Sequence, residues 1–259
     1  MDLKLNDKTA LVTGATGGIG LAIATALANE GATVFVTGRS QDKLDKAVAA
    51  IGGKAKGVLA DAATADGAAA ILKAVPAVDI LVNNIGIYEM KAFADIPDED
   101  WLKLFDVNVM SGVRLSRGYF PGMIERNWGR VIFISSESGL ATPAEMVHYG
   151  MTKSAQLAVA RGMAQATKGT GVTVNSVLPG PTRAEAIADF LKSVSTNPDG
   201  TTAEHEAEFF EKHRSASLLQ RMIEPEEIGS LVAYVASPLS SATNGASLKV
   251  EGGLVTTIA

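Results

Sequence analysis

The sequence predicts a doubly wound α/β fold, in which one seven-stranded parallel sheet is covered by helices on both faces and carries a small helical lid. Along the chain, short apolar runs rich in β-branched residues alternate with longer segments of helical period. A glycine-rich turn separates the first of these runs from the first helical segment. The chain has 259 residues, 47% of them apolar and 20% charged, which suffices for one core. We therefore expect a single domain over residues 1–259.

Seven short apolar segments rich in β-branched residues have the composition of strands in a sheet that is covered on both faces. The expected strands cover residues 9–13, 33–37, 56–60, 79–83, 130–135, 173–177 and 247–250. Amphipathic or Ala-rich segments between them predict helices over residues 18–30, 41–51, 64–75, 98–125, 147–168 and 225–236.

Residues 182–224 depart from this alternation, and we expect two helices there that lie outside the sheet. Thr201 and Glu204 have the spacing of a capping box, and Pro225 with two following glutamates opens the next helix. We interpret the charges of residues 204–214 as the solvated face of a lid helix whose Phe209 and Phe210 face inward.

Composition excludes several classes of function. Lys and Arg number 23 against 28 Asp and Glu, for a net charge of −5 without a basic block, so no nucleic-acid partner is expected. The absence of Cys excludes disulfides, thiolate nucleophiles and cysteine-based metal sites, and it fits a reducing compartment. The first eight residues lack the apolar run of a signal peptide, and we interpret the uncharged run 9–29 as strand, turn and buried helix, so we expect a cytoplasmic protein with no membrane partner.

The three histidines do not predict a metal site. His205 is followed by Glu206 but lacks the second His that a zinc-binding helix requires. His148 adjoins Tyr149 but points about 100° away from it on a helix, so we expect a structural role for it.

The first motif is the run from Thr13 to Gly20, which follows an expected strand and opens an expected helix. Glycines in such a turn let backbone N–H groups and the helix N-terminus approach a pyrophosphate. The pattern favours dinucleotide binding, although an ordinary strand-to-helix turn can carry the same glycines. The expected contacts come from Gly14, Thr16, Gly18, Ile19 and Gly20.

The second constellation is Tyr149 with Lys153, which share one face of a helix at a spacing of one turn. A phenol of ordinary pKa ~10 is a poor base at neutral pH, and a neighbouring cation in a partly dry cleft lowers that value. Such pairs also occur by chance on helix surfaces. Ser136 strengthens the functional interpretation, because it follows an apolar strand at the sheet edge where ligands bind.

Together these motifs resemble the short-chain dehydrogenase/reductase family, whose members have a Rossmann fold. The resemblance covers nearly the whole chain and includes a 13-residue separation between Ser136 and Tyr149. Its motifs are the glycine turn at 13–20, the Asn83-Asn84-Ile85-Gly86 segment, Asn108, Ser136, the Tyr149 and Lys153 pair, Pro179-Gly180 with Thr182, and a closing stretch from Asn244-Gly245 to Gly252-Gly253.

The resemblance implies four catalytic residues. Tyr149 would protonate a carbonyl oxygen during reduction and act as the base in reverse, while Ser136 would polarise that oxygen. Lys153 would lower the pKa of the tyrosine and bind the ribose hydroxyls of the nicotinamide, and Asn108 would support a water chain to the lysine. A turn cap is the alternative for Ser136, and local backbone hydrogen bonding is the alternative for Asn108.

The resemblance also implies cofactor contacts, which for Pro179 and Gly180 follow from the family motif alone. Asp61 would accept a hydrogen bond from the adenine amino group, or would simply cap a turn before Thr64. Asn83 and Gly86 would line the adenosine side, and Thr182 would meet the carboxamide. Ile85 stands where the family usually has Ala, and we expect binding to survive this change.

The end of the second expected strand bears on the choice of cofactor. An NAD-specific site places a carboxylate there for the ribose 2′-hydroxyl, whereas this chain has Thr37, Gly38, Arg39 and Ser40. The Arg39 guanidinium can grip a 2′-phosphate, and the hydroxyls can add hydrogen bonds. The pattern resembles that of NADP(H)-preferring relatives. An arginine can also stack on adenine in an NAD site, so NAD(H) is the alternative.

These observations predict an NADP(H)-dependent oxidoreductase that acts on a small or medium, mainly apolar ketone or secondary alcohol. A dinucleotide-binding sensor or scaffold without turnover is one alternative, and an epimerase or dehydratase is another. We expect the substrate pocket between residues 87–90, residues 137–147 and the lid. Surplus apolar residues on two helices predict a homotetramer or dimer; they are Trp101, Leu104, Phe105, Val109, Leu115, Leu157, Val159 and Met163.

Overall fold

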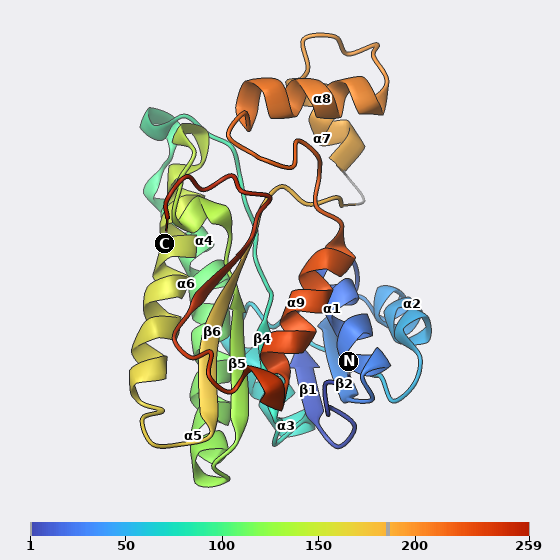
Figure 1. The fold of residues 1–259 in the computed structure, drawn as a ribbon, viewed down its shortest axis with the longest axis vertical. Coiled ribbons are helices and arrows are strands. Elements are labelled where there is room, and N and C mark those ends of the chain that lie inside the picture. Colours follow the sequence, from blue (N-terminus) through green and yellow to red (C-terminus); the bar gives the residue numbers. More distant parts are fainter. Residues whose placement is uncertain (1, 185–186, 259) are drawn as a thin grey trace.

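The computed structural model describes residues 2–184 and 187–258, and a parallel sheet forms its centre (Figure 1). Within these residues the sheet has seven strands in the order β3-β2-β1-β4-β5-β6-β7, which confirms the expected fold class. The strands are β1 (Thr9–Val12), β2 (Thr33–Gly38), β3 (Lys56–Leu59), β4 (Ile80–Asn83), β5 (Gly129–Ile134), β6 (Val172–Pro179) and β7 (Ser247–Val250).

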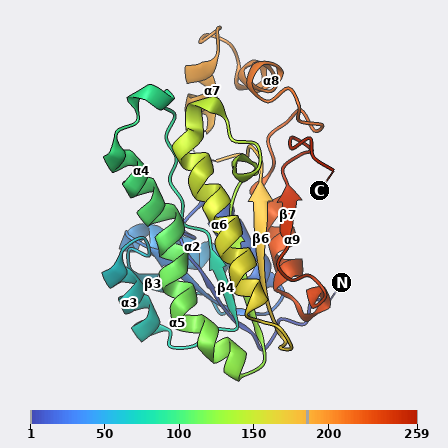
Figure 2. The ribbon, with the colours of Figure 1, turned by 90° about the vertical axis from the view of Figure 1, so that its left-hand side faces the viewer.

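Helices cover both faces of the sheet, as the alternating pattern requires. One face packs against α1 (Gly18–Asn29), α2 (Gln41–Ile51) and α9 (Pro225–Ala236), with Ile23, Leu27 and Val232 in its core. The other face packs against α3 (Ala65–Ala74), α5 (Ser111–Glu125) and α6 (Val147–Gln165), which lie in front of the sheet in Figure 2. Successive residues of a strand therefore enter different cores: Val12 belongs to the first core and Leu11 to the second.

The order of the strands places a switch point between β1 and β4. From β1 the chain runs outward through β2 and β3, then returns to pair β4 with the other side of β1, with Leu11 opposite Leu81. The connections after β1 and β4 therefore leave the sheet toward opposite faces. A crevice at the carboxyl ends of the two strands is the usual ligand site of such sheets.

The helix expected over residues 98–125 is interrupted. The structure has α4 (Asp98–Phe105), a π-helical turn (Asp106–Met110) and α5. A π-helical turn inserts one extra residue into the helix, and such turns are frequent at functional sites. Here it buries Asn108 completely.

The two helices expected between residues 182 and 224 are present as α7 (Ile187–Val194) and α8 (Thr202–His213), beyond the end of the sheet (Figure 1). The predicted capping box is confirmed, since the Thr201 hydroxyl accepts from the Glu204 amide and the Glu204 carboxylate accepts from the Thr201 amide. Both expected phenylalanines are buried, in a small cluster of Leu191, Phe209, Phe210 and Met222.

The polar face of α8 is solvated only in part: Glu204, Glu211 and Lys212 are exposed as expected, whereas His205 and Glu206 are not. His205 is buried, and its Nε2 lies 2.8 Å from the Asn197 carbonyl oxygen. The Glu206 carboxylate accepts from the Arg183 guanidinium and from the Met222 amide, which ties α8 to the connection before α7. The spacing of charged residues along α8 shows which of them share a face, but it does not show that Arg183 and the Met222 amide pack against that face.

Some of the apolar residues assigned to an oligomer interface are explained by the monomer. Leu104, Val109 and Leu115 are buried in it, whereas Phe105 and its neighbour Leu102 are exposed. Among the described helices, none combines the length and the hydropathy that a bilayer crossing demands.

Candidate active site

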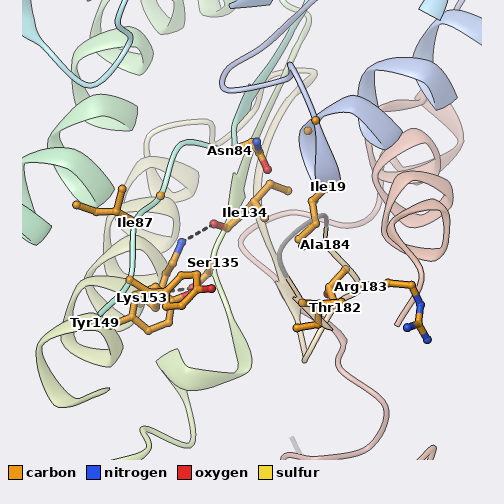
Figure 3. Close-up of a pocket in the computed structure, with 15 residues that line it drawn as sticks. Ile19, Asn84, Ile87, Ile134, Ser135, Tyr149, Lys153, Thr182, Arg183 and Ala184 are labelled. Atoms are coloured by element: carbon orange, nitrogen blue, oxygen red, sulfur yellow. Dashed lines mark hydrogen bonds between the residues drawn. The ribbon is translucent and has the colours of Figure 1, made fainter. Parts of the chain in front are cut away.

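Three adjoining cavities lie at the carboxyl ends of the strands. The first is lined by Gly14, Thr16, Arg39, Asp61 and Ile85. The second is lined by Ile19, Gly20, Ser135, Tyr149, Lys153 and Thr182 (Figure 3). The third lies under α7 and α8 and is lined by Met90, Ser136, Glu137, Phe209 and Arg214 among others.

Shared residues make these cavities one continuous groove. Asn84, Gly86 and Ile87 line both the first and the second cavity. Tyr88 and Tyr149 line both the second and the third. The groove therefore runs from Arg39, past Lys153 and Tyr149, to the helices beyond the sheet.

The turn after β1 needs glycine at positions that the sequence singled out. Gly14 has φ +62° and Gly18 has φ +53°, in the left-handed region that L side chains rarely adopt. A Cβ on Gly20 would lie 2.5 Å from the Gly14 carbonyl oxygen. Gly18 itself faces a different hollow, between α1 and α9, so its contribution is the shape of the turn. Ile85 lies beside this turn, with its Cδ1 3.2 Å from where a Gly14 Cβ would be.

The Asn83 side chain does not face the groove, contrary to the expectation that it would line the adenosine side. Asn83 is the last residue of β4, and its Nδ2 donates to the Ser116 hydroxyl of α5 at 3.1 Å instead of lining a cavity. Asn84 lines the groove in its place and donates to the carbonyl oxygens of Thr13 at 2.9 Å and Gly14 at 3.2 Å. The two-residue period of β4 contains this signal, because Asn83 has the parity of Leu81, which also faces α5.

Arg39 and Asp61 lie together at the outer end of the groove. The Arg39 Nη1 is 3.9 Å from the Asp61 Oδ2, and the two side chains are 79% and 37% exposed. Asp61 lines the first cavity, and its carboxylate also accepts from the Ala63 amide in a turn before Thr64, as the alternative interpretation predicted. Ser40 is exposed at the start of α2 and does not line the first cavity.

Ser136 and Tyr149 come from different elements and meet at the junction of the second and third cavities. Ser136 follows β5, where its hydroxyl accepts from the Ser138 amide at 3.1 Å and donates to the Glu137 carboxylate. Ser136 therefore caps the turn after β5, as the alternative interpretation predicted, and it also lines the third cavity. Tyr149 lies in the first turn of α6, edge-on to Tyr88 at 6.2 Å between ring centroids.

The pKa of Tyr149 is raised well above the ordinary value of 10, first by burial and then by the negative charge of Glu137. A hydrogen bond with Ser136 acts in the opposite direction. The expectation of a lowered pKa is therefore wrong for the protein alone. Burial of the phenol is the main reason, and the carboxylate of Glu137 adds to it. The position of Glu137 beside Ser136 depends on a turn that the sequence pattern did not define.

Lys153 reaches the same junction from the next turn of α6. Its ammonium donates to the Ile134 carbonyl oxygen at 3.0 Å, at the end of β5 (Figure 3). Burial lowers its pKa to about 8, against the opposing effect of the Glu137 charge. A Cβ on Gly86 would lie 3.3 Å from this ammonium, so glycine keeps the second cavity open there.

Asn108 lies behind the groove and does not line any of the three cavities. Its Nδ2 donates to the Ile87 carbonyl oxygen at 2.9 Å and to the Thr152 hydroxyl at 3.0 Å, and its Oδ1 accepts from the Ile87 amide at 2.8 Å. These bonds hold the loop after β4 against α6. The local backbone bonding that was the alternative for Asn108 does not account for them, because they reach two other elements.

The residues that follow β6 line the groove where the second and third cavities adjoin. Pro179 is buried at the end of the strand, Gly180 and Thr182 line the third cavity, and Thr182 also lines the second. The Thr182 hydroxyl donates to the Gly180 carbonyl oxygen at 2.8 Å. A Cβ on Gly180 would lie 2.7 Å from the Glu251 carbonyl oxygen, so this turn needs glycine for close packing.

The third cavity agrees in part with the expected substrate walls. Tyr88, Met90 and Met146 line it, whereas Leu140 is exposed outside it. Sequence reasoning missed Arg214, which follows α8 and lines the cavity with its guanidinium 5.6 Å from the Phe209 ring. Its position depends on how α8 packs beyond the end of the sheet, which no local pattern indicates.

His148 lies outside the three cavities, completely buried against Trp101 at 5.9 Å between ring centroids. In residues 2–184 and 187–258, no group of three or more His, Asp or Glu side chains is arranged to hold a metal ion.

Comparison with known proteins identifies the family. The family model for short chain dehydrogenases matches residues 8–194, which contain the glycine turn, Ser136, Tyr149 and Lys153. The chain belongs to this family of oxidoreductases. Two curated relatives resemble it over almost their full length: the uncharacterized oxidoreductase YvaG of Bacillus subtilis is 47% identical with 100% of both chains covered, and the 3-oxoacyl-(acyl-carrier-protein) reductase FabG of Vibrio cholerae is 34% identical with 97% of this chain and 99% of the relative covered.

A solved member of similar structure was crystallised with ligands. L-Sorbose reductase from Gluconobacter frateurii, complexed with NADPH and L-sorbose, superposes with a TM-score of 0.92 at 27% identity, with 100% of both chains covered. This likeness makes a nicotinamide dinucleotide the cofactor type to consider for the groove.

Proposed function

We propose that this short-chain dehydrogenase reduces a small or medium ketone with NADPH, or oxidises the corresponding secondary alcohol with NADP⁺. The observation that carries the proposal is the meeting of Ser136, Tyr149 and Lys153 where the second and third cavities join. A proton donor, a hydrogen-bonding hydroxyl and a cation at one point suit the conversion of a carbonyl group into an alcohol.

The groove fits a dinucleotide. The glycine turn leaves its backbone uncovered at the amino end of α1, and positions 14 and 20 have no room for a Cβ without movement of Ile85 or the turn itself. Arg39 and Asp61 would hold the adenosine end, Asn84 and Gly86 would flank the middle, and Lys153 and Thr182 would contact the nicotinamide end. When bound, NADP(H) donates or accepts the hydride.

The residues of the chain would handle the proton. The Tyr149 phenol is protonated at neutral pH, as a phenol of ordinary pKa already is, and burial and Glu137 raise its pKa further. It therefore has a proton that it can donate to the oxygen of a carbonyl group. Ser136 would hold that oxygen, for which its hydroxyl must turn away from Glu137. Lys153 would bind the ribose hydroxyls, and Asn108 would act at one remove by fixing the loop after β4.

The walls of the third cavity support a mainly apolar substrate. Tyr88, Met90, Met146 and Phe209 supply most of its surface, with Glu137 at the reacting end and Arg214 toward α8. Two of the relatives named above are a 3-oxoacyl-(acyl-carrier-protein) reductase and an L-sorbose reductase, so reductases similar to this chain act on different carbonyl compounds.

A turnover screen tests this proposal. Chemically diverse ketones are offered with NADPH and with NADH, and secondary alcohols with NADP⁺ and with NAD⁺. We expect steady consumption of NADPH with at least one ketone class. NADPH binding without turnover of any carbonyl or alcohol would contradict the proposal and indicate a sensor or scaffold. Product formation without net change of NADPH would indicate an epimerase or dehydratase.

We also infer that residues 1–259 work as one unit in a homo-oligomer, with α7 and α8 as a lid over the third cavity. The exposed Leu102 and Phe105 on α4 support an interface there. Light scattering should give a mass two or four times that of the chain. A species of 26.8 kDa alone at micromolar concentration would contradict the oligomer.

A further inference from the structure

A buried amide joins the ammonium of Lys153 to the π-helical turn. Gln156 lies one turn after Lys153 on α6 and is 1% exposed. Its Oε1 accepts from the Lys153 Nζ at 3.2 Å, and its Nε2 donates to the backbone carbonyl oxygen of Asn108 at 2.7 Å. Gln156 does not line any of the three cavities, so it meets neither substrate nor cofactor there.

The partners fix which way the Gln156 amide points. An ammonium has only hydrogens to donate, and a backbone carbonyl oxygen can only accept. A flipped amide would set its NH₂ group against the ammonium and its oxygen against the carbonyl oxygen, and both contacts would be repulsive. The oxygen of Gln156 therefore faces Lys153.

Packing alone does not call for an amide at this position. A methionine side chain has nearly the same length, and it would fill the space without burying a polar group that must find partners. Here each end of the amide has one partner, and both partners belong to the proposed site or to the turn that supports it. The amide of Gln156 therefore serves to hold the Lys153 ammonium through the hydrogen bond to its oxygen.

We propose that Gln156 is a positioning residue that keeps the Lys153 ammonium charged and fixed between α6 and the π-helical turn. The inference rests on the proposed function, in which Lys153 binds the cofactor ribose. Gln156 and the Ile134 carbonyl occupy two of the three N–H donors of Lys153. One donor is left for the second cavity, which Lys153 lines.

The effect on ionisation has a definite sign. Burial lowers the pKa of Lys153 to about 8, and the charge of Glu137 opposes that fall. The Gln156 oxygen accepts a hydrogen bond from the ammonium, and such a bond also favours the charged form. The ionisable groups that face Lys153 are Tyr149 on the same helix and Glu137 after β5, while Asn108, Gln156 and the backbone carbonyls are neutral. Loss of the Gln156 oxygen should therefore lower the pKa further, by about one unit.

The variants Gln156→Met and Gln165→Met test the proposal. Gln165 ends the same helix and is exposed, so Gln165→Met is the matched control. The ionisation of Lys153 is followed by trace labelling with acetic anhydride over a pH series and mass spectrometry of its peptide. NADPH affinity is followed over the same series by the fluorescence of the bound nucleotide, so neither measurement needs turnover.

We expect Gln156→Met to lower the pKa of Lys153 by about one unit and to weaken NADPH binding about tenfold near pH 9, with little change near pH 6. Gln165→Met should behave as wild type. A Lys153 pKa and an NADPH pH profile that match wild type in folded Gln156→Met would overturn the proposal.

The variant Gln156→Glu tests the same proposal if Gln156→Met does not fold. Gln156→Glu places a carboxylate beside the ammonium, and we expect it to raise the pKa of Lys153. An unchanged pKa in Gln156→Glu would also overturn the proposal. If wild type binds NADPH but turns over no carbonyl or alcohol, the proposed function fails, and the labelling result still decides the role of Gln156.

Discussion

Replacing Arg39 with alanine tests the basis of cofactor choice. The guanidinium lies at the outer end of the groove, 79% exposed, with the Asp61 carboxylate 3.9 Å away. An exposed ion pair of that length contributes about 0 to 1 kcal/mol, so Asp61 does not hold the guanidinium back from a phosphate. Under the proposed function, Arg39 would therefore be available to bind the 2′-phosphate that distinguishes NADPH from NADH.

The expected magnitude follows from this exposure. Hydrogen bonds to a charged group contribute about 1.5 to 3 kcal/mol, and water competes strongly at an exposed side chain, which favours the lower end. A loss of about 1.4 kcal/mol corresponds to a tenfold change. We expect Arg39→Ala to lower kcat/KM for NADPH about tenfold and to leave kcat/KM for NADH nearly unchanged.

Initial rates with each nucleotide, at one saturating ketone concentration, measure this ratio. Arg117→Ala, on the exposed face of α5, is the control for loss of a positive charge elsewhere. The preference for NADPH should also shrink as salt rises, because the Debye length falls below about 8 Å. If Arg39→Ala keeps the wild-type preference, or if wild type uses NADH equally well, the assignment of Arg39 is refuted.

Three further predictions concern charge and mobility. Glu137→Gln should lower the pKa of Tyr149, because it removes a negative charge that raises this pKa. Ultraviolet titration of tyrosinate measures the shift, with Glu137→Gln/Tyr149→Phe as the blank. An unchanged pKa of Tyr149 would contradict the role given to the Glu137 charge. Because folding lowers the pKa of Lys153 from 10.5 to about 8, the unfolded chain binds more protons between these values, so the free energy of unfolding should rise with pH across that window. Urea unfolding of wild type and Lys153→Met should show this rise only in wild type. Hydrogen exchange in α7 and α8 should be fast without ligand and slow with NADPH and substrate, and equal protection in both states would argue against a lid.

The strands and the glycine turn could be predicted from sequence because their signals are local. The inner strands are short apolar runs, and the turn at Gly14 to Gly20 lies between a strand and a helix. The edge strands β3 and β7 are less buried than expected, because each has a neighbouring strand on one side only. The prediction of one helix over residues 98–125 was wrong because the same local pattern is compatible with two backbone conformations. A helix over residues 98–125 and a helix broken by a π-helical turn have almost the same apolar period, yet only the second buries Asn108 next to α6.

The site could be predicted as a set of residues but not as an electrostatic environment. Ser136, Tyr149 and Lys153 lie together, as the helix spacing of the last two and the family resemblance led us to expect. The charge of Glu137 acts on Tyr149 only because a tight turn buries that carboxylate beside Ser136. Arg214 enters the third cavity through the packing of α8, which is a tertiary contact that no motif records.

The most direct test of the central claim is the rate of NADPH oxidation by wild type and by Tyr149→Phe with the best ketone of the screen. Tyr149→Phe keeps the ring and removes the proton donor, so kcat should fall by about 10² to 10⁴ while the Kd for NADPH stays near that of wild type. A Tyr149→Phe enzyme that retains most of the wild-type rate would contradict the assignment of Tyr149 as the proton donor.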